Sequence, residues 1–239
     1  MNRITRLVRA TSVAATLLAL SAAASAQTTG TPNTSGSVSM SGTVSNFVEL
    51  NSGGPATLTG NSTGSVTTDG TEDQVLAVVI NLGQLNPSNR NSFVKASVPL
   101  KIRSNASYVL SMSAVVESSG DASGRKIAAS DFGFGLGSVT RANVVGVNTA
   151  GEDTKAAAGD PTAAGQVNAT TGRFEWAGAN DDLGDYSSSA TILSGDYIME
   201  PVPTSNTGGL TVPAIFAVKP QFFASATTTA AVTFTVTAP

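Results

Sequence analysis

The sequence predicts an all-β chain that folds as a single β-sandwich of roughly 8–10 antiparallel strands with long loops rich in Gly, Ala and Asp. Short apolar segments alternate with polar residues at a period of two, and turn residues separate these segments. The composition favours Gly, Ser, Thr and Val over the Leu, Glu, Lys and Arg of soluble helices. No Cys is present, so the hydrophobic core must hold the fold without disulfides.

Residues 1–26 have the layout of a secretory signal peptide. Three arginines within the first nine residues form a positive region, and an apolar run over residues 13–20 follows. Ala24-Ser25-Ala26 then supplies a small-residue cleavage site. The run is too short to span a bilayer. We therefore expect residues 27–239 to be secreted, to the extracellular space, the cell surface or the periplasm.

The charge and residue types of the exported part exclude several functions. Removing the leader leaves 10 of the 13 basic residues against 16 acidic ones, a net charge of −6, which argues against a nucleic-acid partner. No second long apolar segment follows, so we expect no transmembrane anchor. Neither His nor Cys is present, which removes the usual general base and thiolate nucleophile. We expect no enzymatic activity.

The N-terminal part of the exported chain predicts a flexible tail at residues 27–36 and a β-sandwich domain at 37–239. The tail has no apolar residue, and a strand-like pattern with Gly42 in the apolar register follows it. This strand either pairs first within its own domain or completes the sheet of a neighbouring molecule. Its residues are the predicted assembly strand: Val38, Met40, Gly42 and Val44.

The middle of the chain carries the clearest strands. Residues 75–82 (VLAVVINL) form an almost continuous apolar run, which predicts a strand buried on both faces. Residues 93–103 and 108–116 both alternate with a period of two, and Ser104-Asn105-Ala106 joins them. This pattern predicts a β-hairpin.

The second half of the chain predicts weaker elements. A strand is expected at 127–136, weakened by its glycines and continued at 139–147. A long loop at 149–171 carries one helical turn at 155–158. Pro213 and Pro220 are expected near strand ends or on an edge. The remaining predicted strands are 173–176, 188–193 and 196–202, with a closing hairpin of 210–223 and 231–236 that places Val232, Phe234 and Val236 in the core.

Residues 173–186 combine acidic side chains with the single Trp of the chain. The cluster is read first as a solvated loop, then as a calcium site, and last as a pair of catalytic carboxyls. Its candidate Ca²⁺ ligands are Asp181, Asp182 and Asp185, with Asp153 and Asp160 as further contributors. Trp176 and Tyr186 are candidate ligand-binding aromatics for a glycan, against the alternative of a Trp buried in the core. No other cofactor is expected.

Three segments carry a resemblance to known proteins: residues 41–44 (SGTV), 98–111 (VPLKIRSNASYVLS) and 232–236 (VTFTV). The chain resembles bacterial exported β-sandwich proteins of the surface-layer, spore-coat and pilin-like type. The resemblance implies an extracellular structural or adhesive role and transfers no functional residue. Unlike many fimbrial subunits, this chain lacks a disulfide. We expect a self-associating structural protein, a homo-oligomer or polymer that also contacts glycans or surface proteins. The alternative is a carbohydrate- or calcium-binding module at residues 176–185.

Overall fold

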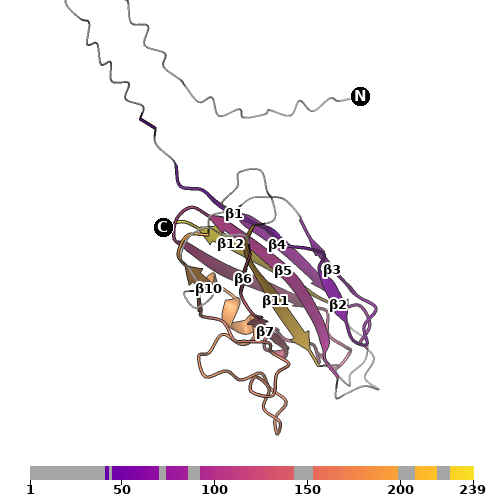
Figure 1. Cartoon of the computed structure of the whole chain (residues 1–239). Helices are drawn as coiled ribbons and strands as arrows, with labels where there is room; N and C mark the ends of the chain where they lie inside the picture. Colours follow the sequence, from indigo (N-terminus) through magenta and orange to yellow (C-terminus); the bar gives the residue numbers. More distant parts are fainter. Residues whose placement is uncertain are drawn as a thin grey trace, which may run out of the picture. The chain divides into compact units, whose positions relative to one another are not determined.

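The computed structural model describes residues 41–42, 45–69, 74–85, 92–142, 153–198, 208–219 and 227–239. Its contacts divide the chain into two units, Met1–Thr43 and Val44–Pro239. The predicted leader and tail lie outside the described residues, as do Val38, Met40 and Val44. All described strands belong to the second unit (Figure 1).

The second unit is a β-sandwich of two six-stranded antiparallel sheets, so the predicted fold class is confirmed. The first sheet has the order β1-β5-β11-β7, with β2 added beside β5 and β8 beside β11. The second sheet has the order β3-β4-β12-β6-β10-β9. The strands of the first sheet are β1 (Val48–Ser52), β2 (Thr57–Thr59), β5 (Val94–Ser104), β7 (Phe132–Leu136), β8 (Thr140–Ala142) and β11 (Gly209–Val218). Those of the second are β3 (Ser65–Thr68), β4 (Val75–Asn81), β6 (Tyr108–Ser118), β9 (Thr154–Lys155), β10 (Ala190–Gly195) and β12 (Thr228–Thr237).

Among the described residues, helical structure is limited to short 3₁₀ turns. These are η2 (Ala129–Asp131) and η3 (Leu183–Tyr186), and η3 contacts β6. Within the described ranges, no helix has the length and apolar character needed to cross a membrane.

The core lies between the two sheets and follows the period-two pattern of the sequence. Every second residue of β5 and of the first half of β6 is buried. Val232, Phe234 and Val236 of β12 are also buried, which confirms their predicted place. The ring centroid of Phe216 on β11 lies 5.2 Å from that of Phe134 in its own sheet and 6.4 Å from that of Phe234 in the opposite sheet.

The two predicted hairpins are wrong, although the strands themselves are present. β5 belongs to the first sheet and β6 to the second, and β11 and β12 are divided in the same way. In each pair the chain therefore crosses from one sheet to the other, and the two strands lie on opposite sides of the core. At the first crossing, the hydroxyl of buried Ser104 donates to the carbonyl of Ala106 and accepts from its N–H. The alternation of apolar residues is the same for a hairpin and for this crossing, so it does not separate them.

The prediction that residues 75–82 are buried on both faces is also wrong. In β4 the side chains of Leu76, Val78 and Ile80 are buried, whereas Val75, Ala77 and Val79 are exposed. The apolar run therefore supplies one core face and one solvent face.

Pro213 lies within β11, a central strand, and not at an end or edge as predicted. It lies opposite Pro99 of β5, and its carbonyl accepts the N–H of Gly137. On the other side of β11, pairing with β8 ends at Thr211 and pairing with β7 begins at Ala214. Pro213 lies in this gap, where neither β7 nor β8 requires a backbone N–H from β11, so the missing N–H of proline breaks no hydrogen bond of the sheet.

The long loop after β9 packs on the first sheet. Phe134 and Leu136 of β7 donate their N–H groups to the carbonyls of Asp181 and Ala158, at 2.7 and 2.8 Å. The Lys95 side chain of β5 reaches Asp160 of the loop at 2.5 Å. The predicted helical turn at 155–158 is absent from the structure, because Lys155 ends β9 and Ala156 bonds to Ile192 of β10. This loop, residues 156–182, is thus the covering loop of β7.

Candidate functional site

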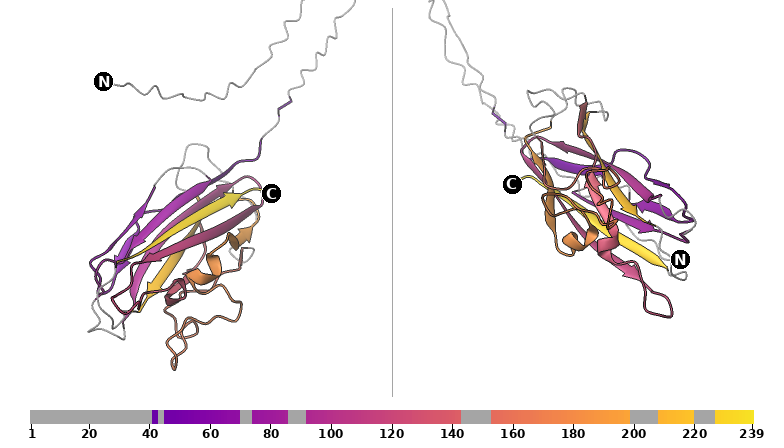
Figure 2. Two further views of the ribbon diagram at one scale, coloured as in Figure 1. Left: turned by 180° about the vertical axis from the view of Figure 1, so that it is seen from behind. Right: turned by 90° about the horizontal axis from the view of Figure 1, so that it is seen from below.

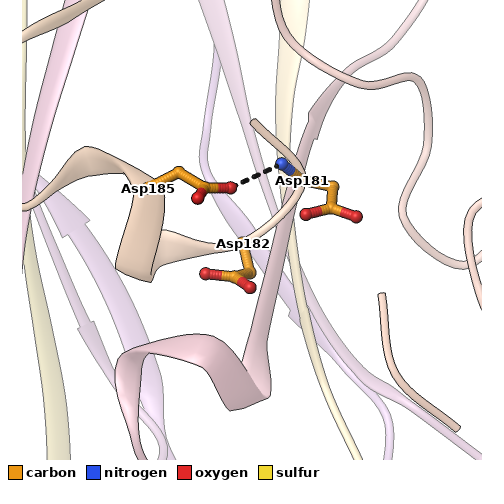
Figure 3. Close-up of side chains that lie close together, drawn as sticks. All are labelled: Asp181, Asp182 and Asp185. Carbon is orange, nitrogen blue, oxygen red and sulfur yellow. Dashed lines mark hydrogen bonds between the residues drawn. The ribbon is translucent and has the colours of Figure 1, made fainter. Parts of the chain in front are cut away.

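Asp181, Asp182 and Asp185 gather at the start of η3. One carboxylate oxygen of each lies within 4.8 Å of the others (Figure 3). The Asp182 carboxylate caps η3 by accepting the N–H of Gly184 at 2.7 Å, and Asp185 accepts the N–H of Asp181 at 3.1 Å. The structure therefore brings together the three acids that the sequence analysis singled out.

The three carboxyls differ in exposure and influence one another. Asp181 is buried, Asp182 is half-buried and Asp185 is exposed. Burial raises the pKa of Asp181, and the charge of Asp185 raises it further. Burial also raises the pKa of Asp182, with smaller increases from Asp185 and Asp181. A hard divalent cation would relieve this repulsion, and carboxylate oxygens are the ligands that Ca²⁺ prefers.

Asp153 and Asp160, the further predicted contributors, do not join the cluster. Asp153 forms an ion pair with Arg141, and Asp160 forms one with Lys95. The calcium prediction therefore reduces to the three residues of the η3 turn.

Trp176 and Tyr186 do not form an aromatic platform. Tyr186 is fully buried, and its ring meets that of Phe134 edge-on at 5.1 Å between centroids. Its hydroxyl donates to the carbonyl of Asn180 at 3.1 Å. A core tyrosine cannot offer its face to a sugar, so its predicted ligand role is wrong. Trp176 is half-buried in the covering loop, against Gly178, and does not lie in the sandwich core.

A buried polar network joins Tyr108, Arg141 and Asp153, three residues that no sequence pattern connected. The Arg141 guanidinium contacts both carboxylate oxygens of Asp153, at 2.9 and 2.5 Å, and the Tyr108 hydroxyl donates to the same carboxylate at 2.7 Å. Burial and the bond to Asp153 raise the pKa of Tyr108. No local motif marks these residues, because they are distant in the sequence. The charges of Arg141 and Asp153 neutralise each other within the network, so we assign it a structural role.

Of the predicted assembly strand, the structure describes Gly42, which is exposed. Further along, Asn105 holds the segment that leads into β1. Its side chain accepts the N–H of Phe47 at 2.6 Å and donates to the carbonyl of Ser45 at 2.9 Å. These bonds hold the chain in place just before β1 begins.

The two edge strands of the first sheet, β7 and β1, differ in the backbone bonds on their outer sides. The covering loop bonds the outer edge of β7. On the opposite side, β1 pairs with β5 over Val48–Ser52, and among the described residues no second backbone partner bonds these five. An edge of this kind is a template for another strand.

Comparisons of the chain with protein-family models, with curated proteins and with solved structures found no match.

Proposed function

We propose that this chain is an exported structural or adhesive protein of the bacterial surface or matrix, which acts by self-association and without catalysis. In this proposal the segment 37–44 of one copy pairs with the outer edge of β1 in the next. The single observation that supports it most is a difference between the two edge strands of the first sheet: the covering loop bonds β7, whereas no second backbone partner bonds β1 among the described residues. A donated strand would bury the free backbone groups of β1.

The position of the donor segment also supports this assignment. Asn105 holds Ser45 and Phe47 at the entrance to β1, so residues 37–44 precede a point that is held in place. Val38, Met40 and Val44 are apolar at alternate positions, and such positions supply the side-chain contacts of an added strand.

The test compares residues 27–239 with residues 47–239 by size-exclusion chromatography and negative-stain electron microscopy. We expect large oligomers or filaments from the longer chain, and from the shorter one a folded chain that forms no filaments, since all described strands lie after residue 47. A peptide of residues 36–46 should bind the shorter chain. The matched control is the same peptide with Val38, Met40 and Val44 replaced by Asp. If the longer chain is monomeric and the shorter one unfolds, the segment belongs to its own domain and strand donation is rejected.

A second candidate function is a calcium- or carbohydrate-binding module, and the clustering of Asp181, Asp182 and Asp185 favours its calcium form. In this case millimolar Ca²⁺ should raise the melting temperature relative to chelator, because a ligand that binds only the folded state stabilises it. D182N should remove the rise, whereas E117Q, an exposed acid on β6, should keep it. A wild-type melting temperature that does not respond to Ca²⁺ would reject this form of the proposal. The half-buried ring of Trp176 is the remaining candidate for a glycan contact, to be tested by comparing W176A with the wild type on a glycan array.

A further inference from the structure

The outer face of the second sheet is open and apolar at its centre. Figure 2, left, views the molecule from behind, where β12 runs in yellow between β4 and β6. Among the described residues, five large apolar side chains are exposed, and three of them, Val75, Val79 and Val115, lie on this face. Exposed apolar side chains that gather on one surface mark an interaction site.

The register makes this patch continuous. Ala231 of β12 lies directly opposite Val79 of β4 on one side and Val115 of β6 on the other. All three side chains point away from the core and are exposed, so they form an apolar stripe across three neighbouring strands. Thr and Ser extend the stripe on both sides, and the other outward residues of these strands are Ala77, Asn81, Val109, Ser111, Ser113, Glu117, Thr229, Thr233, Thr235 and Thr237.

Charge is confined to the margin of this face. Glu117 is the only ionisable residue among the outward positions of β4, β12 and β6, and it lies near one end of β6. Asp69 lies just after β3, where its carboxylate accepts the N–H of Ala77. The first sheet differs, because Lys95, Lys101 and Arg103 occupy outward positions of β5 and the covering loop binds it.

We infer that the outer face of the second sheet packs against the same face of a second copy of this chain. Because the centre of the face is uncharged, two copies meet there without the repulsion that their net negative charge imposes elsewhere. A charged partner would find no complementary group at the centre. Two such faces of Val, Ala, Thr and Ser can pack as the two sheets of a sandwich do, and a two-fold axis places the same residues on both sides of the contact.

The size of the face sets the strength of this contact. Seven residues of β4 at ~3.3 Å each and three strands at ~4.8 Å give a plane of about 330 Å² per copy. A standard stable interface uses about 800 Å² per partner. The isolated pair is therefore weak, with a dissociation constant on the order of micromolar or above. Copies that are already linked through donated strands would pair far more strongly by effective concentration. This inference rests on the proposed function in one respect: it takes the partner on this face to be a second copy of the chain.

Sedimentation equilibrium of residues 27–239 tests the contact with a charge-reversal pair at its centre. A231K and A231E should each weaken association at least about tenfold, because each places like charges opposite each other in an apolar contact. A mixture of the two variants should associate again, since Lys then faces Glu. The matched control is A177K, an exposed alanine in the covering loop, which should associate like the wild type. Thermal melts should show that all the variants are folded.

The outcomes separate this contact from strand donation. Face pairing should persist in residues 47–239, which lack the donor segment, while strand-linked oligomers should disappear. A wild-type chain that stays monomeric at millimolar concentration would overturn the inference. So would an A231K variant that associates as well as the wild type, or a mixture of A231K and A231E that fails to associate.

Discussion

Arg141 and Asp153 form a buried two-pronged ion pair that joins the edges of the two sheets. Arg141 lies on β8 of the first sheet, and Asp153 immediately precedes β9 of the second. Their side chains are 5% and 0% exposed, and the guanidinium also donates to the carbonyl of Tyr197. Since Tyr108 at the start of β6 bonds the same carboxylate, one acid holds three segments together.

Removal of this acid should severely destabilise the fold. D153A removes the carboxylate that neutralises the buried Arg141 charge, which costs about 3–5 kcal/mol in the free energy of unfolding. Y108F removes a single hydrogen bond to a charged group and should cost about 1.5–3 kcal/mol. Urea unfolding of both variants measures the difference. A loss below about 1 kcal/mol for D153A would show that the pair is not a joint between the sheets.

Gly135 should be intolerant of any side chain. A Cβ built on it would lie 1.6 Å from the carbonyl oxygen of Gly159, so the covering loop cannot keep its place on β7. G135A should cost about 1–3 kcal/mol by overpacking and should expose the loop to limited proteolysis. The control is G165A, where a Cβ meets no atom within 4 Å. Equal stability and equal protease resistance of the two variants would contradict this account of the loop.

The Lys95–Asp160 pair should make the covering loop sensitive to acid. Burial raises the pKa of Asp160, but the bonds from Lys95 and Thr162 outweigh it, so the pKa lies below its ordinary value of 3.8. A lowered folded pKa adds stability that is complete above 3.8 and is lost as the pH falls through the folded value. D160N should therefore cost about 0.2–1 kcal/mol at neutral pH, and progressively less as the pH falls below 3.8. Chemical unfolding at several pH values tests this, and a constant difference across them would refute it.

Asn105 should control the order of the segment that enters β1. N105A removes the side-chain bonds to Ser45 and Phe47, and should cost about 0.5–1.5 kcal/mol. The amide of Phe47 should then exchange its hydrogen faster, while amides within β5 stay protected. S107A, which loses only a long 3.4 Å contact to Asp196, serves as the control. Unchanged exchange at Phe47 would show that other contacts hold this segment.

The candidate acidic site could be predicted only in part. Asp181, Asp182 and Asp185 are close in sequence, and a single 3₁₀ turn brings their carboxylates together, so spacing was enough to find them. Tyr186 lies in the same turn, but its ring points into the core against Phe134. The direction in which a side chain points from a turn depends on what the turn packs against. Arg141 and Asp153 meet only because two sheet edges meet, and no local pattern could have shown this.

By itself the sequence determined the β-class of the chain, the strands of the core and the residues that face it. These follow from a period of two, which is a local property of the backbone and needs no knowledge of the partner strand. Only the tertiary structure decided which sheet each strand joins, why Gly135 is a glycine, and that Val75, Val79 and Val115 face outward. β5 and β6 carry the pattern of a hairpin yet lie in opposite sheets, because side-chain alternation records that one face of a strand is buried. It does not record whether the next strand lies beside that strand or across the core from it.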